Sequence, residues 1–178
     1  MLLTVLMISL LASCAPARES AEEKRNALLE SDFACEARLT CYLGDDVVTY
    51  TMEIHPGERT DLTLIEPEEL KGLKASVEGE DLTLTYQDVL FACEKPEDAV
   101  YPPVMLLPAA WAALKEGVLV GSEMTEEGLL ASFSRFEGEE EYIFTFLFGN
   151  EETPLKRITL EKNGRELASA VILRTLMT

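Results

Sequence analysis

Tyr142-Ile143-Phe144-Thr145-Phe146-Leu147-Phe148 is the most apolar stretch of this sequence and the one that indicates its fold. Its apolar residues alternate with a period of two, which is the period of a β-strand. The four aromatic side chains share one face of that strand, while Ile143 and Leu147 lie on the other. A strand that is apolar on both sides is covered on both sides. The stretch therefore predicts an inner strand of a sheet whose faces are packed.

The same period recurs on both sides of this stretch and predicts a mainly β protein. In residues 33–43, for example, Cys35, Leu39 and their alternate neighbours share one face. Turn sequences separate the strands, including Asn163-Gly164, which is typical of a tight hairpin. The further predicted strands are 33–43, 47–54, 59–65, 73–77, 82–86, 89–93, 128–136, 155–160 and 167–176.

One helix interrupts the strands, over residues 104–116. This segment is rich in Met, Leu, Ala and Trp, contains Pro108 and is ended by Gly117. We expect an α+β, mainly β architecture, with about nine or ten strands in one largely antiparallel sheet. Because such a sheet curls through its twist, it forms an unclosed half-barrel with the main helix packed in its mouth.

The N-terminus carries the most specific signal in the chain. An apolar run leads into Leu11-Ala12-Ser13-Cys14, which resembles the bacterial lipobox, where the cysteine is lipid-modified and begins the mature protein. The run has the length of the apolar region of a signal peptide and is too short to span a bilayer. The alternative is an ordinary signal peptide that is cut elsewhere.

These features predict three regions. Residues 1–13 are a lipoprotein signal peptide, residues 14–31 are a tether in which 22–30 can form a short helix, and residues 32–178 are the half-barrel domain. We expect the protein in the cell envelope, held at the extracytoplasmic face of the membrane by a palmitate-type lipid on Cys14, since two lipid chains give stable attachment.

The composition limits the kinds of partner that the protein can bind. The 178 residues carry a net charge of −18, which argues against nucleic acid as a partner because affinity for phosphates comes from Lys and Arg. At 47% hydrophobic residues the chain is not disordered. Beyond Cys14 the cysteines are Cys35, Cys41 and Cys93. Cys93 can pair with either of the others across strands, or all can be free thiols.

No pattern in the sequence indicates an enzyme. The one histidine, His55, lies in a His-Pro-Gly turn, and the usual nucleophile, phosphate-loop and dinucleotide motifs are absent. The cysteines lack the close spacing of zinc sites, and the acidic clusters lack that of EF-hand calcium loops. We expect no catalytic residues, no cofactor and no metal.

The order of parts resembles a known family. A first hairpin (33–54) is followed by 62–65, which runs into Glu66-Pro67-Glu68-Glu69-Leu70-Lys71-Gly72-Leu73, then by 81–86, an apolar helix, and closing strands with Pro154-Leu155-Lys156-Arg157-Ile158. This order is similar to that of the bacterial lipoprotein-carrier (LolA/LolB-like) superfamily, including germination lipoproteins of spore formers, and the connector is similar to its "P-x-x-L-x-G" motif. The resemblance implies an unclosed β-barrel with a helical lid that holds acyl chains or presents a surface to a partner. The carrier's lid-locking arginine has two candidates here, Arg38 and Arg59, and neither is assigned.

The apolar side chains of the helix and of the strands facing it give the candidate site. A packed core is one interpretation, and an apolar cavity that takes an acyl chain is the other, since each buried methylene contributes about 0.8 kcal/mol. The predicted cavity lining is Tyr50, Met52, Met105, Trp111, Phe144, Phe146 and Phe148. We expect a non-catalytic, membrane-anchored lipoprotein that binds a lipid, an acyl chain or a lipidated peptide in the half-barrel. The alternative is a protein-binding scaffold or regulator of a cell-envelope enzyme, with an exposed sheet edge or face as its interface.

Overall fold

A computed structural model describes residues 15–79, 81–93 and 103–176. The predicted signal peptide and Cys14 lie outside these residues. The described chain is one antiparallel sheet of eleven strands with two α-helices and a short 3-10 helix. The helices are α2 (Ala15–Glu30), η1 (Glu68–Leu70) and α3 (Pro103–Glu116).

The strands follow one another in space almost as they do in sequence. The order across the sheet is β6-β5-β4-β3-β2-β1-β11-β10-β9-β8-β7, so the first and last strands of the domain meet in the middle. The strands are β1 (Ala34–Leu43), β2 (Asp46–His55), β3 (Arg59–Glu66), β4 (Lys74–Glu78), β5 (Asp81–Tyr86), β6 (Val89–Cys93), β7 (Val118–Met124), β8 (Leu129–Glu137), β9 (Glu140–Phe148), β10 (Leu155–Lys162) and β11 (Arg165–Leu176).

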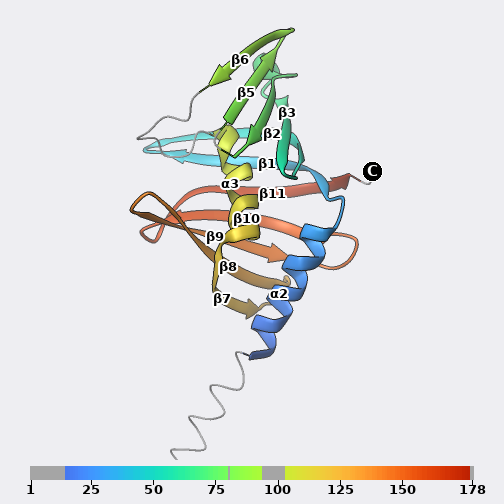
Figure 1. Cartoon of the computed structure of the whole chain (residues 1–178), viewed down its shortest axis with the longest axis vertical. Helices are drawn as coiled ribbons and strands as arrows, with labels where there is room; N and C mark the ends of the chain where they lie inside the picture. Colours follow the sequence, from blue (N-terminus) through green and yellow to red (C-terminus); the bar gives the residue numbers. More distant parts are fainter. Residues whose placement is uncertain (1–14, 80, 94–102, 177–178) are drawn as a thin grey trace, which may run out of the picture.

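The sheet does not close, and it curls around α3. Strands β6 and β7 are its two edges and lie at opposite ends of the molecule, while α3 crosses in front of the strands between them (Figure 1). Helix α3 contacts β4 on one side and β8, β9 and β10 on the other. The prediction of an unclosed half-barrel with a helix in its mouth is confirmed.

Local patterns produce the hairpins as predicted. Along β1 the residues of the predicted inner face are buried, among them Cys35, Leu39 and Cys41. Asn163 and Gly164 both have positive φ, 53° and 72°, and join β10 to β11 in a two-residue turn. This is the backbone that a tight hairpin requires and that Asn-Gly adopts at low cost.

The sequence did not predict strand β7, so the sheet has eleven strands where about nine or ten were expected. Its segment V-L-V-G-S-E-M contains Gly121, and the register with β8 shifts between Leu119 and Gly121. A bulge of this kind breaks the alternation on which strand prediction depends. The chain enters β7 directly from α3 at Gly117, where a Cβ atom would overlap the carbonyl oxygen of Ala113.

Helix α2 is longer than the 22–30 segment predicted, and it packs on the body. Ala21 and Leu28, two turns apart on one face, are buried in the core. The Nζ atom of Lys24 donates a hydrogen bond to the carbonyl oxygen of Gly149 (3.1 Å). Within the described residues, neither helix has the length and apolarity needed to cross a bilayer.

Candidate ligand-binding groove

The two sides of α3 have different surroundings. Its inner side presents Leu106, Leu107 and Ala110 to the central strands, where Leu39 and Phe144 oppose them. The space left between helix and sheet here is only about 10 Å³. Cavities of that size admit at most one water molecule. At this place the described side chains of helix and sheet therefore pack closely against each other.

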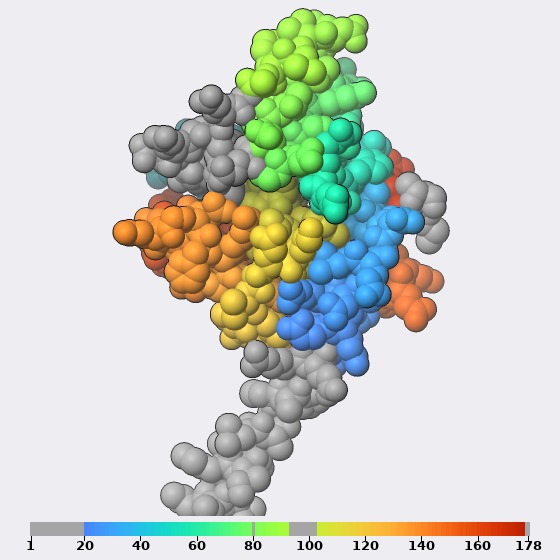
Figure 2. All heavy atoms as spheres, viewed as in Figure 1, coloured from blue at the N-terminus to red at the C-terminus, as the bar shows by residue number. Residues whose placement is uncertain are grey.

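The outer side of α3 forms the floor of an open groove of about 240 Å³ at the mouth of the half-barrel. Figure 2 shows α3 reaching the surface between the green strands of one part of the sheet and the orange strands of the other. One rim comes from the β2–β3 turn, the start of β3 and the end of β4, and the other comes from the end of β8. The lining residues are Gly57, Glu58, Thr60, Val77, Gly79, Met105, Pro108, Ala109, Trp111, Ala112, Lys115, Glu116, Arg135 and Glu137.

The structure divides the predicted cavity lining between these two places. Met105 and Trp111 line the outer groove, and Phe144 lines the small inner space. The other four predicted residues line neither of the two and pack within or against the core: Tyr50, Met52, Phe146 and Phe148. Phe146 packs edge-on against Phe133, with ring centroids 5.7 Å apart.

Trp111 is the largest side chain of the groove and is held in place by an aromatic neighbour. Its ring stacks on that of Phe33, just before β1, with centroids 5.9 Å apart and planes 6° from parallel. Stacked rings of this kind add stability beyond the area that they bury. The tryptophan therefore presents a fixed, half-buried apolar surface to the groove.

Arg25 fastens α2 to the end of α3 that forms the groove. Its Nη2 atom donates a hydrogen bond to the carbonyl oxygen of Lys115 (2.6 Å), in the last turn of α3, where carbonyl groups lack helical partners. Its Nη1 atom lies 3.2 Å from a carboxylate oxygen of Glu22, and its guanidinium lies 5.3 Å from the ring centre of Phe133. The sequence offered no signal for this contact between residues 90 positions apart.

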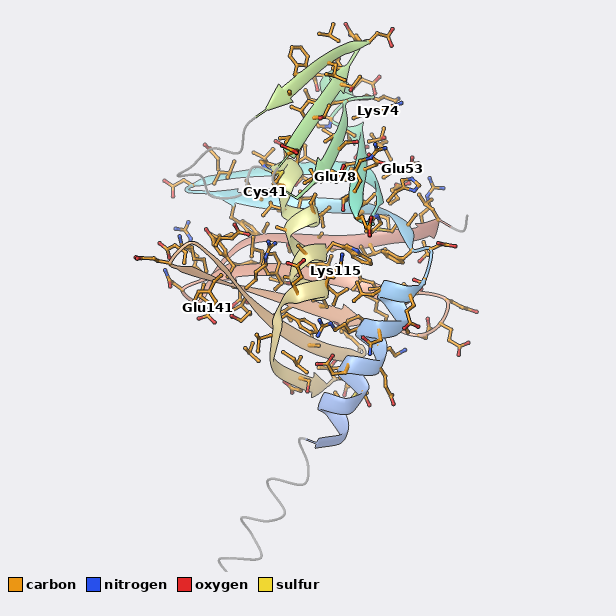
Figure 3. All side chains as sticks on the ribbon, viewed as in Figure 1. Cys41, Glu53, Lys74, Glu78, Lys115 and Glu141 are labelled. Carbon is orange, nitrogen blue, oxygen red and sulfur yellow. The ribbon has the colours of Figure 1, made fainter. Side chains whose placement is uncertain are left out.

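The charges of the groove nearly cancel. Lys115 and Arg135 face three carboxylates, from Glu58, Glu116 and Glu137. The guanidinium of Arg135 lies 3.3 Å from Glu137, and Lys115 projects from the last turns of α3 (Figure 3). Such a lining does not attract an anionic group over long range. The groove thus combines an apolar helix face with charged side chains at its rims.

Sequence patterns missed both rims of the groove. The rim residues lie far apart in the chain, in a turn and at two strand ends, and the curl of the sheet brings them together. A partial signal was present for the floor, where Met105, Pro108, Ala109 and Ala112 recur at helical spacing. Because the rest of the helix is equally apolar, that spacing did not stand out.

The remaining candidate groups of the sequence lie apart from the groove. His55 is exposed at the end of β2, and the 15–79, 81–93 and 103–176 segments contain no cluster of His, Cys, Asp and Glu that could hold a metal ion. Cys35 and Cys41 are free thiols. Burial raises the pKa of Cys35 to about 12 and that of Cys41 to about 11, so both stay protonated at neutral pH.

Comparison with known proteins bears on the fold. No family model and no curated protein matches the sequence. Among solved structures, an uncharacterized conserved protein from Thermus thermophilus is similar, with 10% identity, a TM-score of 0.51, and coverage of 90% of this chain and 87% of that one. A proposed outer membrane lipoprotein-sorting protein domain from Vibrio parahaemolyticus has 6% identity, a TM-score of 0.50, and coverage of 88% and 90%.

A LolA superfamily protein from Nitrosomonas europaea is also similar, with 10% identity, a TM-score of 0.45, and coverage of 89% of this chain and 91% of that one. Likeness at such identities concerns the fold. The eleven-stranded open sheet, the helix in its mouth and the match to a lipoprotein-sorting domain along nearly the whole chain agree with the resemblance found in the sequence. The chain therefore has a LolA-like fold.

Proposed function

We propose that this protein is a non-catalytic lipoprotein of the cell envelope that holds an acyl chain, from a lipid or a lipidated peptide, in the groove over α3. The observation that carries the proposal is the groove itself, an open channel of about 240 Å³ on an apolar helix face that includes Met105 and Trp111. Binding of an acyl chain requires no catalytic or polar group, because each methylene that the chain buries contributes about 0.8 kcal/mol to the binding free energy.

The size of the groove determines how such a chain would lie. Pockets that enclose a small molecule measure roughly 300–1,000 Å³, so this groove covers part of an acyl chain and leaves the rest exposed or against the membrane. Deeper entry between α3 and the central strands requires the helix to move away from Leu39 and Phe144, because the space that they line measures only about 10 Å³. The proposed attachment through Cys14, the residue before α2, keeps the groove within reach of membrane lipids.

Native mass spectrometry of the soluble form that begins at Ala15, purified gently from cells, tests the proposal. We expect extra mass that is released as a lipid. In the Ala112→Glu variant the occupancy should fall at least tenfold, because a carboxylate would then project into the apolar floor. Val47→Glu is the matched control, since Val47 is 61% exposed on β2 and does not line the groove.

Two results together would contradict acyl binding. The wild-type protein would be purified without bound lipid, and its Trp111 fluorescence would show no uptake of added palmitate. Trp111 is the only tryptophan of the chain, so its emission reports on the groove alone.

A further inference from the structure

Strand β6 forms one edge of the sheet, and its exposed side chains are apolar. It is an edge strand, outermost at one end of the molecule (Figure 1), and its sequence Val89-Leu90-Phe91-Ala92-Cys93 carries no charge. Val89, Leu90 and Phe91 are 52%, 67% and 51% exposed. Phe91 lies opposite Leu84 of β5 and so shares its face, while Leu90 lies on the other face. Both faces of the strand thus present apolar side chains, next to a backbone edge that pairs with no other strand among the described residues.

The opposite edge of the sheet is protected by several features. Strand β7 contains the register shift at Leu119/Gly121 and the charged residue Glu123, and α2 packs beside it. Bulges, charges and covering helices are the means by which proteins block an edge from pairing. Strand β6 pairs with β5 without a register shift and contains neither a charge nor a proline. Within 15–79, 81–93 and 103–176, β6 is therefore the edge of the sheet that lacks these protective features.

The turn before β6 determines which backbone groups face outward. Gln87 and Asp88 have positive φ, 49° and 65°, and join Tyr86 to the opposite residue Val89 in a two-residue turn. The residues that flank such a turn form a hydrogen-bonded pair, and the pairs alternate along an antiparallel ladder. It follows that the N–H and C=O groups of Leu90 and Ala92 point away from β5.

We infer that β6 binds an extended segment of another protein as an added strand, one with alternating apolar residues and neutral or basic flanks. Main-chain hydrogen bonds to Leu90 and Ala92 supply affinity in this mode, and alternate side chains of the segment lie beside Phe91. Charge argues for the partner's chemistry, because residues 66–93 contain seven acidic and two basic side chains. A second copy of the chain, with its own charge of −18, would be repelled, whereas lysines on a partner are attracted.

This surface is separate from the proposed acyl site. None of the residues that line the groove belongs to β5 or β6. The two activities therefore succeed or fail independently, and the Ala112→Glu variant, which blocks the groove, should bind a peptide at β6 as the wild type does.

A fluorescein-labelled peptide of alternating valine and threonine with lysine at both ends serves as the probe, with fluorescence anisotropy as the measurement. Ala92→Pro removes the outward N–H group and is tolerated where an edge faces solvent, while Ala92→Val keeps that group and is the matched control. We expect Ala92→Pro to weaken binding at least tenfold and Ala92→Val to leave it within about twofold. Equal binding by the two variants, or no binding by the wild type, overturns the inference.

If the Ala92→Pro variant does not fold, hydrogen exchange in the wild-type protein tests whether a peptide binds at β6. Addition of the peptide should slow exchange at the Leu90 and Ala92 amides and leave that of β7 unchanged. Unchanged exchange at Leu90 and Ala92 with the peptide in excess overturns the inference.

Discussion

At the scale of single residues, burial controls the chemistry of the two inner cysteines. Cys35 and Cys41 lie six residues apart on the buried face of β1, each about 2% exposed or less. Removal from water disfavours the charged thiolate, which explains why the pKa values of both thiols are raised, to about 12 and about 11. The residues therefore act as small apolar core side chains and not as nucleophiles.

This predicts slow alkylation of Cys35 and Cys41 in the folded protein. With iodoacetamide at pH 8 we expect both to react about a hundredfold or more slowly than in the urea-unfolded chain, because so little thiolate is present. Mass spectrometry of the digested protein measures each site separately. Labelling of either cysteine at the unfolded rate would contradict the burial described here.

The same pKa values set a direction for stability at alkaline pH. A thiol whose pKa is raised in the folded state contributes its full stability below the ordinary thiol pKa of 9.0. That contribution is lost as pH rises from about this value toward the folded pKa values near 11 and 12. The free energy of unfolding is therefore expected to fall with pH over that range, which urea denaturation at a series of pH values measures.

At the scale of elements, β9 holds the core together because it is buried along most of its length. Phe144, Phe146 and Phe148 are at most 1% exposed, and the ring of Phe146 packs edge-on against Phe133 and stacked against Phe148. Leu147, on the opposite face, is also buried. Close packing of this kind makes the loss of one ring costly, since the cavity that remains does not collapse fully.

Phe146→Ala is accordingly expected to lower the free energy of unfolding by about 3–5 kcal/mol. Phe136→Ala on the neighbouring strand β8 is the matched control, with a side chain that is 64% exposed, and should change it by no more than about 0.5 kcal/mol. Urea denaturation monitored by circular dichroism measures both. Similar losses from the two substitutions would show that β9 is not the packed centre of the sheet.

At the scale of the whole molecule, α2 lies between the body of the domain and the predicted anchor at Cys14. The helix begins at Ala15, directly after Cys14, and is held to the body through the buried residues Ala21 and Leu28 and through Arg25 at the end of α3. A helix rises about 1.5 Å per residue. If Cys14 carries lipid, the body and its groove stay within a few tens of ångströms of the bilayer.

The lipidation prediction is tested in cells by Cys14→Ser. We expect this variant to lose metabolic labelling with palmitate and to leave the membrane fraction, because the thioether-linked lipid cannot form on serine. Cys41→Ala is the control, which should keep both the label and the membrane location. Retention of label by Cys14→Ser would mean that the lipid is attached elsewhere.

The strands, most hairpins and the class of fold could be predicted from the sequence, because alternation and turn residues act over short distances along the chain. Ten of the strands follow from period-two patterns such as that of Tyr142–Phe148, and the bulged β7 was missed because its pattern is broken. The candidate groove, by contrast, could not be predicted in this way. Since α3 is apolar all round, its periodicity could not tell that Leu106 and Leu107 face the sheet while Met105 and Trp111 face the groove. The rims of that groove, from the β2–β3 turn to Arg135, meet only because twist accumulates across the sheet, and this is a property of the assembled strands and of no single stretch.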